Sequence, residues 1–162
     1  MWHLLPFSRG SVKITDTSAF TYPQITVNYF SVDYDLAVQT AIARLSRRIL
    51  NHSAFSNISA GEIMPGTDIV PDDEHSGSDE AWKSWLLSPV PDGIRPVWHE
   101  IGTASMMRRD LGGVVDGTLR VYDTTNLRVV DASVLPLQMS GHLIATIYGI
   151  AEKASDFIKS GI

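Results

Sequence analysis

Residues 98–107 read WHEIGTASMM, and residues 138–158 read QMSGHLIATIYGIAEKASDFI. In the first stretch, His99 follows an aromatic residue at the end of an extended segment, and small residues come after it. In the second stretch, His142 comes just before an apolar helix, in a region where the positive end of the helix dipole attracts anions. Each histidine alone is more simply explained as a structural or surface residue, so any function must come from the two together.

The residues between these stretches predict short strands. Residues 112–136 read GGVVDGTLRVYDTTNLRVVDASVLP. Apolar runs at 114–115, 119–122 and 127–130 are separated by turn residues, which is typical of short strands. The last run ends at Asp131, and strand ends often carry ligand contacts. A single Asp there is more often a turn former.

Three helices are expected from residue spacing. Residues 33–50 carry apolar side chains every three or four positions, with Ser31 or Asp33 as the cap. Residues 79–87 form a short helix with two tryptophans on one side. A third helix starts near His142, is capped by Ser140 and ends near Gly161. The expected apolar stripe of the first helix is Leu36, Val38, Ile42, Leu45 and Ile49, and the expected buried stripe of the third helix is Ile144, Ile147, Ala151, Ala154 and Ile158.

The N-terminal part adds two extended segments, at 9–15 and 24–29. Residues 65–78 (PGTDIVPDDEHSGS) are polar and predict a surface loop. The expected fold class is therefore α+β, with a small, mainly antiparallel sheet and about three helices. We expect residues 1–162 to form a single domain.

Composition excludes several classes of protein. Apolar residues make up 44% of the chain and charged residues 19%, with a net charge of −5. A nucleic-acid surface needs clustered basic residues, and the densest group here, Arg44, Arg47 and Arg48, is most simply a solvated face. The chain has no cysteine, which excludes disulfides and a thiolate nucleophile. No apolar run is long enough to span a bilayer, and we expect a cytoplasmic location.

We expect no metal site. Asp72, Asp73, Glu74 and His75 are four potential ligands in a row, but no helical or hairpin spacing holds them together, so a solvated loop is the better interpretation. The chain contains no GxGxxG, P-loop or GxSxG motif.

The three C-terminal motifs in this order resemble the end of the glucose–methanol–choline (GMC) flavin oxidoreductases. The similarity is greatest to the fungal aryl-alcohol oxidase and glucose oxidase branch. The early LLPFSRGSVKI (4–14) and Asn28-Tyr29-Phe30 resemble the entry to the family's substrate-binding domain. The resemblance covers nearly the whole chain and implies a GMC C-terminal-domain-like fold. The family's FAD-binding half, with its GxGxxG motif, has no counterpart here.

The resemblance also implies a site. His99 and His142 match the two catalytic positions, where one residue accepts the alcohol proton and the other orients the substrate. If FAD is kept, Asp131, Ala132 and Leu143 match the family's flavin contacts. The substrate-binding residues expected around the two histidines are Trp98, Glu100, Thr103, Ser105, Met106, Met139 and Ser140.

The chain also departs from the family pattern. Arg108 stands where many relatives have Pro, Glu100 stands where Pro or Gly is frequent, and Asp123 stands where the RVYG motif has Gly. The last departure predicts that the turn at Asp123 differs from that of the relatives.

Three functions stay open at the level of sequence. Met1 stands just before the SRGSVKI motif, which favours a stand-alone, cofactor-free enzyme that directs cyclisation (dehydrative or pericyclic, such as Diels–Alder) or isomerisation of a small hydrophobic biosynthetic intermediate. The second function is the C-terminal part of an FAD-dependent alcohol oxidase or dehydrogenase. The third is a non-catalytic remnant that binds a partner protein.

Expectations about partners follow from the same features. We expect a small hydrophobic substrate, and neither nucleic acid nor membrane as a partner. Because the last strand and helix of the family pack into the absent half, their apolar surface predicts a homodimer.

Overall fold

The computed structural model describes residues 1–89 and 93–162. The chain divides into two compact units. Unit 1 comprises Met1–Gly10 and Val27–Pro96, and unit 2 comprises Ser11–Thr26 and Val97–Ile162. The expectation of a single domain over residues 1–162 stays a prediction beside this division.

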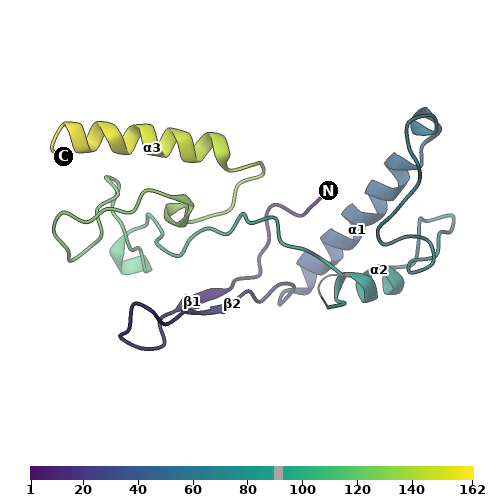
Figure 1. The fold of residues 1–162 in the computed structure, drawn as a ribbon, viewed down its shortest axis with the longest axis horizontal. Coiled ribbons are helices and arrows are strands. Elements are labelled where there is room, and N and C mark those ends of the chain that lie inside the picture. The colour runs from purple at the N-terminus through teal and green to yellow at the C-terminus, as the bar shows by residue number, and fades with distance from the viewer. Residues whose placement is uncertain (90–92) are drawn as a thin grey trace. The chain divides into compact units, whose positions relative to one another are not determined.

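The predicted α+β class is confirmed (Figure 1). The helices are α1 (Asp33–Leu50), α2 (Asp79–Leu86) and α3 (Ile144–Lys159). Strands β1 (Ser11–Lys13) and β2 (Gln24–Thr26) pair antiparallel, with Val12 opposite Ile25. Three short 3-10 helices complete the assigned elements: η1 (Ser53–Phe55), η2 (Arg109–Leu111) and η3 (Ala132–Val134).

In unit 1, α1 packs against α2. The apolar core here includes Val70 and, from α2, Trp82 and Leu86, and the Trp82 and Trp85 rings meet edge to face. Within the apolar stripe predicted for α1, Leu45 and Ile49 are exposed, and Leu36, Val38 and Ile42 are half-buried. The residues that α1 buries are polar: Asp35, Gln39, Thr40 and Arg47.

The predicted cap of α1 is also wrong. The N-cap is Val32, and no side chain of its own caps the helix. Its backbone N–H instead donates to Ser8 Oγ at 3.2 Å, so a segment distant in sequence supplies the partner. In α2, by contrast, Ser78 is a local cap and accepts a hydrogen bond from the Ala81 N–H.

Arg47 joins α1 to α2 and to the loop of residues 65–78, where the Ser76 carbonyl accepts from its guanidinium at 3.4 Å. Its guanidinium donates to both carboxylate oxygens of Glu62, at 2.7 and 2.8 Å, and lies 4.4 Å from the centroid of the Trp82 ring. The expectation that Arg47 belongs to a solvated face is therefore wrong: the side chain is buried and paired. A bidentate arginine–carboxylate pair over an aromatic face is a strong and geometrically specific contact.

The core of unit 2 consists of Val115, Leu119, Val134 and Ala154, the last from α3. The strands predicted at 119–122 and 127–130 are reduced to single bridges, Val115 with Val121 and Arg120 with Arg128. Left-handed residues interrupt these segments at Leu119, Asp123 and Asn126, which prevents an extended ladder.

The end of α3 agrees with the prediction, but its start does not. The helix begins at Ile144 after Leu143, so the predicted cap at Ser140 is wrong, and His142 precedes the helix. At the other end, Gly161 is left-handed at φ +71°, and the Ile162 N–H donates to the Phe157 carbonyl. This is the Schellman arrangement expected of a helix-ending glycine.

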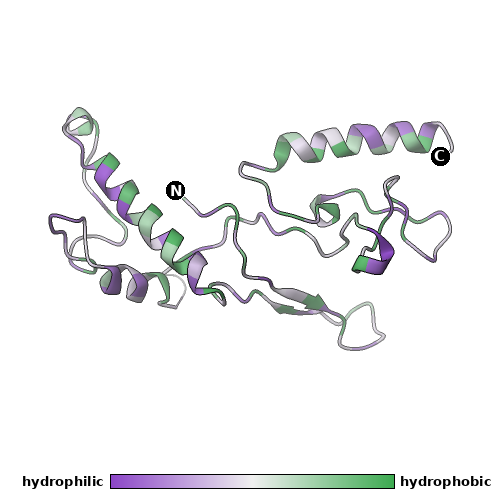
Figure 2. Cartoon of the chain, turned by 180° about the vertical axis from the view of Figure 1, so that it is seen from behind, coloured by the Kyte–Doolittle hydropathy of each residue, from purple (hydrophilic) through white to green (hydrophobic). Residues whose placement is uncertain are grey.

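The buried stripe predicted for α3 is wrong at three positions. Of its five residues only Ala154 is buried, while Ile144, Ala151 and Ile158 are exposed. Figure 2 shows hydrophobic residues on both α1 and α3, and Ile144 and Tyr148 are 68% and 70% exposed. Across the described residues, no helix combines the length and apolarity that a membrane span requires.

Candidate functional site

Unit 2 brings the two histidines of the sequence motifs together. The rings of His99 and His142 meet edge to face, with centroids 5.2 Å apart and planes at 83°. His99 is half-buried and His142 is exposed. Two imidazoles at this separation can act on one small molecule, the first as proton acceptor and the second as hydrogen-bond donor.

The main chain at and after His99 is held by hydrogen bonds. Trp98, just before it, has φ +55°, a left-handed conformation that is uncommon for a bulky residue. The Gln138 side-chain amide donates from Nε2 to the His99 carbonyl at 3.0 Å. Further along, the Ala104 and Met106 N–H groups donate to the carbonyls of Ser133 and Val134.

Two side-chain atoms at this site are buried and find no hydrogen-bond partner among the described residues. They are Nδ1 of His99 and Oε1 of Gln138. Buried polar atoms of folded proteins are nearly always paired, so these two atoms are exceptions within the described part of the chain.

The predicted substrate-binding residues are distributed unevenly. Trp98 is 83% exposed, and Glu100, Thr103 and Ser140 are exposed too. Ser105 is half-buried, and its hydroxyl donates to the Gly102 carbonyl within its own turn. The Met139 sulfur accepts a weak hydrogen bond from the Thr146 hydroxyl at 3.7 Å. Met106 is 36% exposed. Trp98 and Glu100 flank His99 in the chain, and the roles of all seven residues in substrate binding stay predictions.

The three residues predicted to contact a flavin lie in or next to short helical elements of unit 2. Asp131 caps η3, since its Oδ1 accepts from the Ser133 N–H at 2.8 Å and from the Ser133 hydroxyl. Ala132 begins η3, and Leu143 is a buried residue directly before α3. No side chain caps α3, and the first N–H groups of a helix have no partner inside it. Free donors therefore lie next to His142 in sequence.

The turn at Asp123 keeps the backbone conformation that a glycine would favour. Asp123 has φ +60°, and aspartate tolerates the left-handed region better than most residues. The expectation that this turn differs from that of the relatives stays a prediction beside this left-handed backbone.

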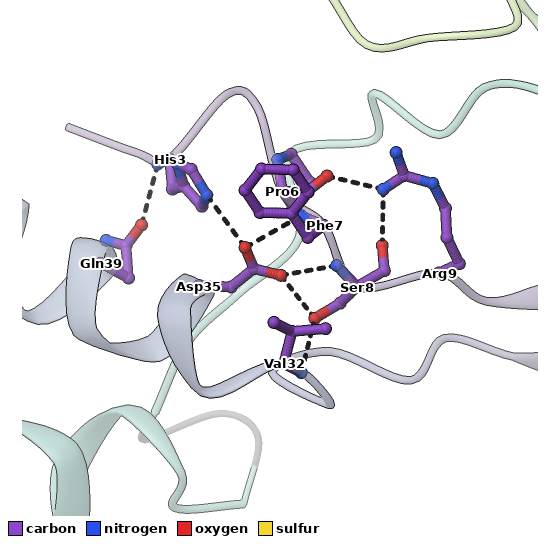
Figure 3. A network of polar contacts seen from close by, with 8 residues as sticks. All are labelled: His3, Pro6, Phe7, Ser8, Arg9, Val32, Asp35 and Gln39. Atoms are coloured by element: carbon purple, nitrogen blue, oxygen red, sulfur yellow. Dashed lines mark hydrogen bonds and ion pairs between the residues drawn. The ribbon is translucent and has the colours of Figure 1, made fainter.

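Unit 1 contains a second polar cluster that spacing alone did not predict (Figure 3). The carboxylate of Asp35 is buried, with 1% of the residue exposed. It accepts hydrogen bonds from the Ser8 hydroxyl at 2.5 Å and from the backbone N–H groups of Ser8 and Phe7 at 2.6 and 2.9 Å. Its Oδ1 lies 3.2 Å from His3 Nε2. Ser, His and Asp are the residue types of a hydrolytic triad, but Asp35 lies between the other two. No imidazole can take the Ser8 proton, so the cluster is a structural clamp.

The clamp keeps Asp35 ionised. Burial by itself raises the pKa of this carboxyl, but the hydrogen bonds from Ser8, Phe7 and His3 outweigh it and lower the pKa from 3.8 to about 2. The ionised carboxylate therefore holds the N-terminal segment of residues 3–8 against the first turn of α1.

Other surfaces of the described chain offer less. A shallow groove of about 430 Å³ is lined by Arg120, Asn126, Arg128, Ile158, Gly161 and Ile162. The Arg128 guanidinium donates hydrogen bonds to the carbonyls of Thr118 and Ile162, so this side chain mainly holds segments of unit 2 together. Within residues 1–89 and 93–162, no group of three or more His, Asp or Glu side chains could hold a metal ion.

Comparison with known sequences gives a consistent family. The model of the GMC oxidoreductase C-terminal region matches residues 6–151. A glucose oxidase-like protein of Humicola fuscoatra is 42% identical over 98% of this chain, which covers 25% of that protein. Glucose oxidase of Penicillium chrysogenum is 36% identical, again over 98% of this chain and 25% of its own length.

Comparison with solved structures agrees. An FAD-dependent oxidoreductase from Chaetomium thermophilum superimposes with a TM-score of 0.81 at 34% identity, over 98% of this chain and 26% of its own. A fungal aryl-alcohol oxidase superimposes with a TM-score of 0.75 at 34% identity, over 96% and 24%.

This chain thus spans about a quarter of the relatives that it matches. Motif order, sequence identity and fold agree that it belongs to the GMC oxidoreductase family and corresponds to the C-terminal domain of its members.

Proposed function

We propose that this chain is the substrate-side part of an FAD-dependent alcohol oxidoreductase, in which His99 and His142 bind the alcohol and take its hydroxyl proton. The observation that supports the proposal is the edge-to-face histidine pair, with ring centroids 5.2 Å apart. A glucose oxidase and an aryl-alcohol oxidase are among the relatives, which gives a primary or aromatic alcohol as the substrate class.

In this proposal each histidine has one task. One imidazole accepts the hydroxyl proton, and the other donates a hydrogen bond to the same oxygen and fixes its position. A positioned general base contributes about 10²- to 10⁴-fold in rate.

The donor set fits a flavin. The uncapped start of α3 presents free N–H groups, which suit the carbonyl-bearing edge of an isoalloxazine ring. Ala132 and Leu143, beside η3 and α3, would contribute main-chain contacts, and Asp131 would hold the η3 turn in shape. When bound, the flavin supplies the two-electron acceptor for the hydride.

The exposed apolar side chains support a larger assembly. Ile144 and Tyr148 lie one helical turn apart on α3 and are both mostly exposed. An apolar helix face of this kind marks a contact surface, and the relatives are about four times as long as the matched chain. We propose that the flavin-binding part of such a protein covers this face.

The test is a graft. Residues 6–151 replace the matching segment of a fungal glucose oxidase, and oxidation of a panel of primary and aromatic alcohols is measured. We expect a yellow protein with turnover, and a loss of roughly 10²-fold or more in His99→Ala or His142→Ala. A control substitution is His75→Ala, because His75 lies on the exposed loop of unit 1. A yellow graft that is inactive on every alcohol, or equally active in all variants, contradicts the proposal.

Cofactor-free cyclisation and a partner-binding remnant stay predictions from the sequence, and no contact in the described residues favours either over the flavoprotein. Titrating the 162-residue chain with FAD and following flavin absorbance separates these alternatives. A perturbed flavin spectrum supports the oxidoreductase. Indifference to FAD combined with turnover of a small hydrophobic intermediate supports the cyclase, and a stable protein complex without turnover supports the remnant.

A further inference from the structure

Catalytic histidines are usually oriented by a hydrogen bond at the ring nitrogen that does not face the substrate. His99 has no such support, because its Nδ1 is buried and finds no hydrogen-bond partner in the described part of the chain. The contacts that the structure gives for this residue are the edge-to-face packing of its ring against His142 and the hydrogen bond to its main-chain carbonyl.

The main chain at His99 is not held by local conformation. Trp98 at φ +55° is in a region that L-residues with large side chains avoid, so outside contacts must maintain it. Gln138 provides one, by donating from Nε2 to the His99 carbonyl at 3.0 Å across 39 residues of sequence.

Chemistry fixes the direction of the Gln138 amide. A carbonyl oxygen only accepts hydrogen bonds, so the nitrogen of the amide must face His99. The oxygen then points elsewhere, and Oε1 is buried without a partner among the described residues. The side chain therefore leaves its own acceptor unsatisfied in order to hold His99.

Gln138 also belongs to the segment that carries the second histidine. It stands four positions before His142 in the run QMSGH. A hydrogen bond from this side chain to the His99 carbonyl therefore joins the two histidine-bearing segments directly.

We propose that Gln138 is the positioning residue of the histidine pair: its amide N–H holds the His99 main chain and thereby keeps the two imidazoles in contact. Gln138 touches no reacting atom in this role. The catalytic value of the contact rests on the proposed function, but the contact itself can be measured without flavin.

Three substitutions separate the donor from the rest of the side chain. Gln138→Met keeps the length and removes both polar atoms. Gln138→Lys keeps a donor and removes the acceptor, while Gln138→Glu keeps an acceptor and places a carboxylate against the His99 carbonyl. Gln24→Leu is the matched control, because Gln24 is exposed on β2.

The measurement is the nuclear Overhauser effect between the ring protons of His99 and His142 in the 162-residue chain at neutral pH. Signals between Ile150 and the cluster of Val115, Leu119, Val134 and Ala154 check the unit 2 core. We expect the ring–ring signal in the unmodified chain, Gln24→Leu and Gln138→Lys, and at least a several-fold loss in Gln138→Met and Gln138→Glu with the core signals retained. Rescue by the donor-bearing Lys distinguishes positioning from simple packing.

Two results overturn the proposal. The first is a ring–ring signal of full strength in Gln138→Met. The second is an equal loss in Gln138→Lys and Gln138→Glu, which would show that the donor is not what matters. If Gln138→Met also loses its core signals, the comparison of Lys with Glu decides alone. Failure of the flavin graft leaves these signals unaffected, so the two proposals fail separately.

Discussion

Asp35 is a buried carboxylate whose hydrogen bonds come mostly from neutral donors. The Ser8 hydroxyl and two backbone N–H groups hold it, with His3 as the one ionisable neighbour that bonds to it. Such a group stabilises the fold only while it is ionised, because the donors are arranged around a negative charge. Its contribution therefore depends on pH in a direction that can be worked out.

We predict that Asp35→Asn lowers the free energy of unfolding by about 2 kcal/mol at neutral pH, which is the equivalent of a pKa lowered from 3.8 to about 2. Because the folded-state pKa lies below the ordinary value, protonation favours the unfolded chain. The difference between the two proteins should therefore be constant above about pH 5 and shrink towards about pH 2.

Urea unfolding at a series of pH values measures this difference. Asp33→Asn is the control, since Asp33 is an exposed carboxylate in the same first turn of α1. If both substitutions cost the same, or if the Asp35 difference does not change with pH, Asp35 does not clamp the chain entry.

At the level of elements, the loop of residues 65–78 depends on one close approach. Gly77 has φ +98°, and a Cβ there would lie 2.8 Å from Trp82 Nε1 and 2.9 Å from Val70 Cγ1. Gly61 has nearly the same φ, +101°, with nothing within 4 Å of its Cβ position. The two glycines thus separate backbone strain from steric conflict.

We predict that Gly61→Ala costs about 1 kcal/mol, from the left-handed backbone alone, and that Gly77→Ala costs about 2 kcal/mol more. The additional cost arises because α2 and the loop must move apart to admit the methyl group. Thermal unfolding of both variants tests the prediction, and equal costs would mean that the loop is not tightly packed on α2.

The sequence predicted the positions of the helices better than it predicted which side of each helix is buried. Periodicity located α1 at residues 33–50, where the structure has it, but Leu45 and Ile49 of its apolar stripe are exposed. The buried side is a set of polar residues whose partners, Ser8 and Glu62, lie in other segments. A pattern of apolar spacing carries no information about such partners, and for that reason the Asp35 and Arg47 networks were missed.

In the candidate site, the sequence likewise predicted residues but not the contacts between them. His99 and His142 were chosen by resemblance to a family, and their spacing would not have revealed the contact. Gln138 lay inside a quoted motif, yet its role depends on a bond to a main-chain carbonyl 39 residues away. A side chain that binds a backbone group leaves no matching residue type in the sequence, so only coordinates could find it.

For the molecule as a whole, the exposed face of α3 predicts association of the isolated chain. Ile144 and Tyr148 are mostly exposed although the helix packs Ala154 into the core. We propose that the free chain forms a homodimer through such apolar surface, and we predict that Ile144→Lys with Tyr148→Lys shifts it to a monomer.

Light scattering at micromolar concentration measures this. Glu152→Lys, an exposed polar position on the same helix, is the control and should leave the mass unchanged. A monomer before any substitution would refute the dimer, and a dimer that survives both lysines would place the interface elsewhere.

The central claim is that the histidine pair takes the proton of an alcohol whose hydride passes to a flavin. Anaerobic bleaching of flavin absorbance by alcohol in the grafted protein tests it most directly, because the signal reports the reaction itself rather than later steps. The account predicts rapid bleaching with His99 and His142 in place, and bleaching at least roughly 10²-fold slower in His99→Ala with His142→Ala at unchanged flavin content. Equal bleaching rates in the two proteins would contradict it.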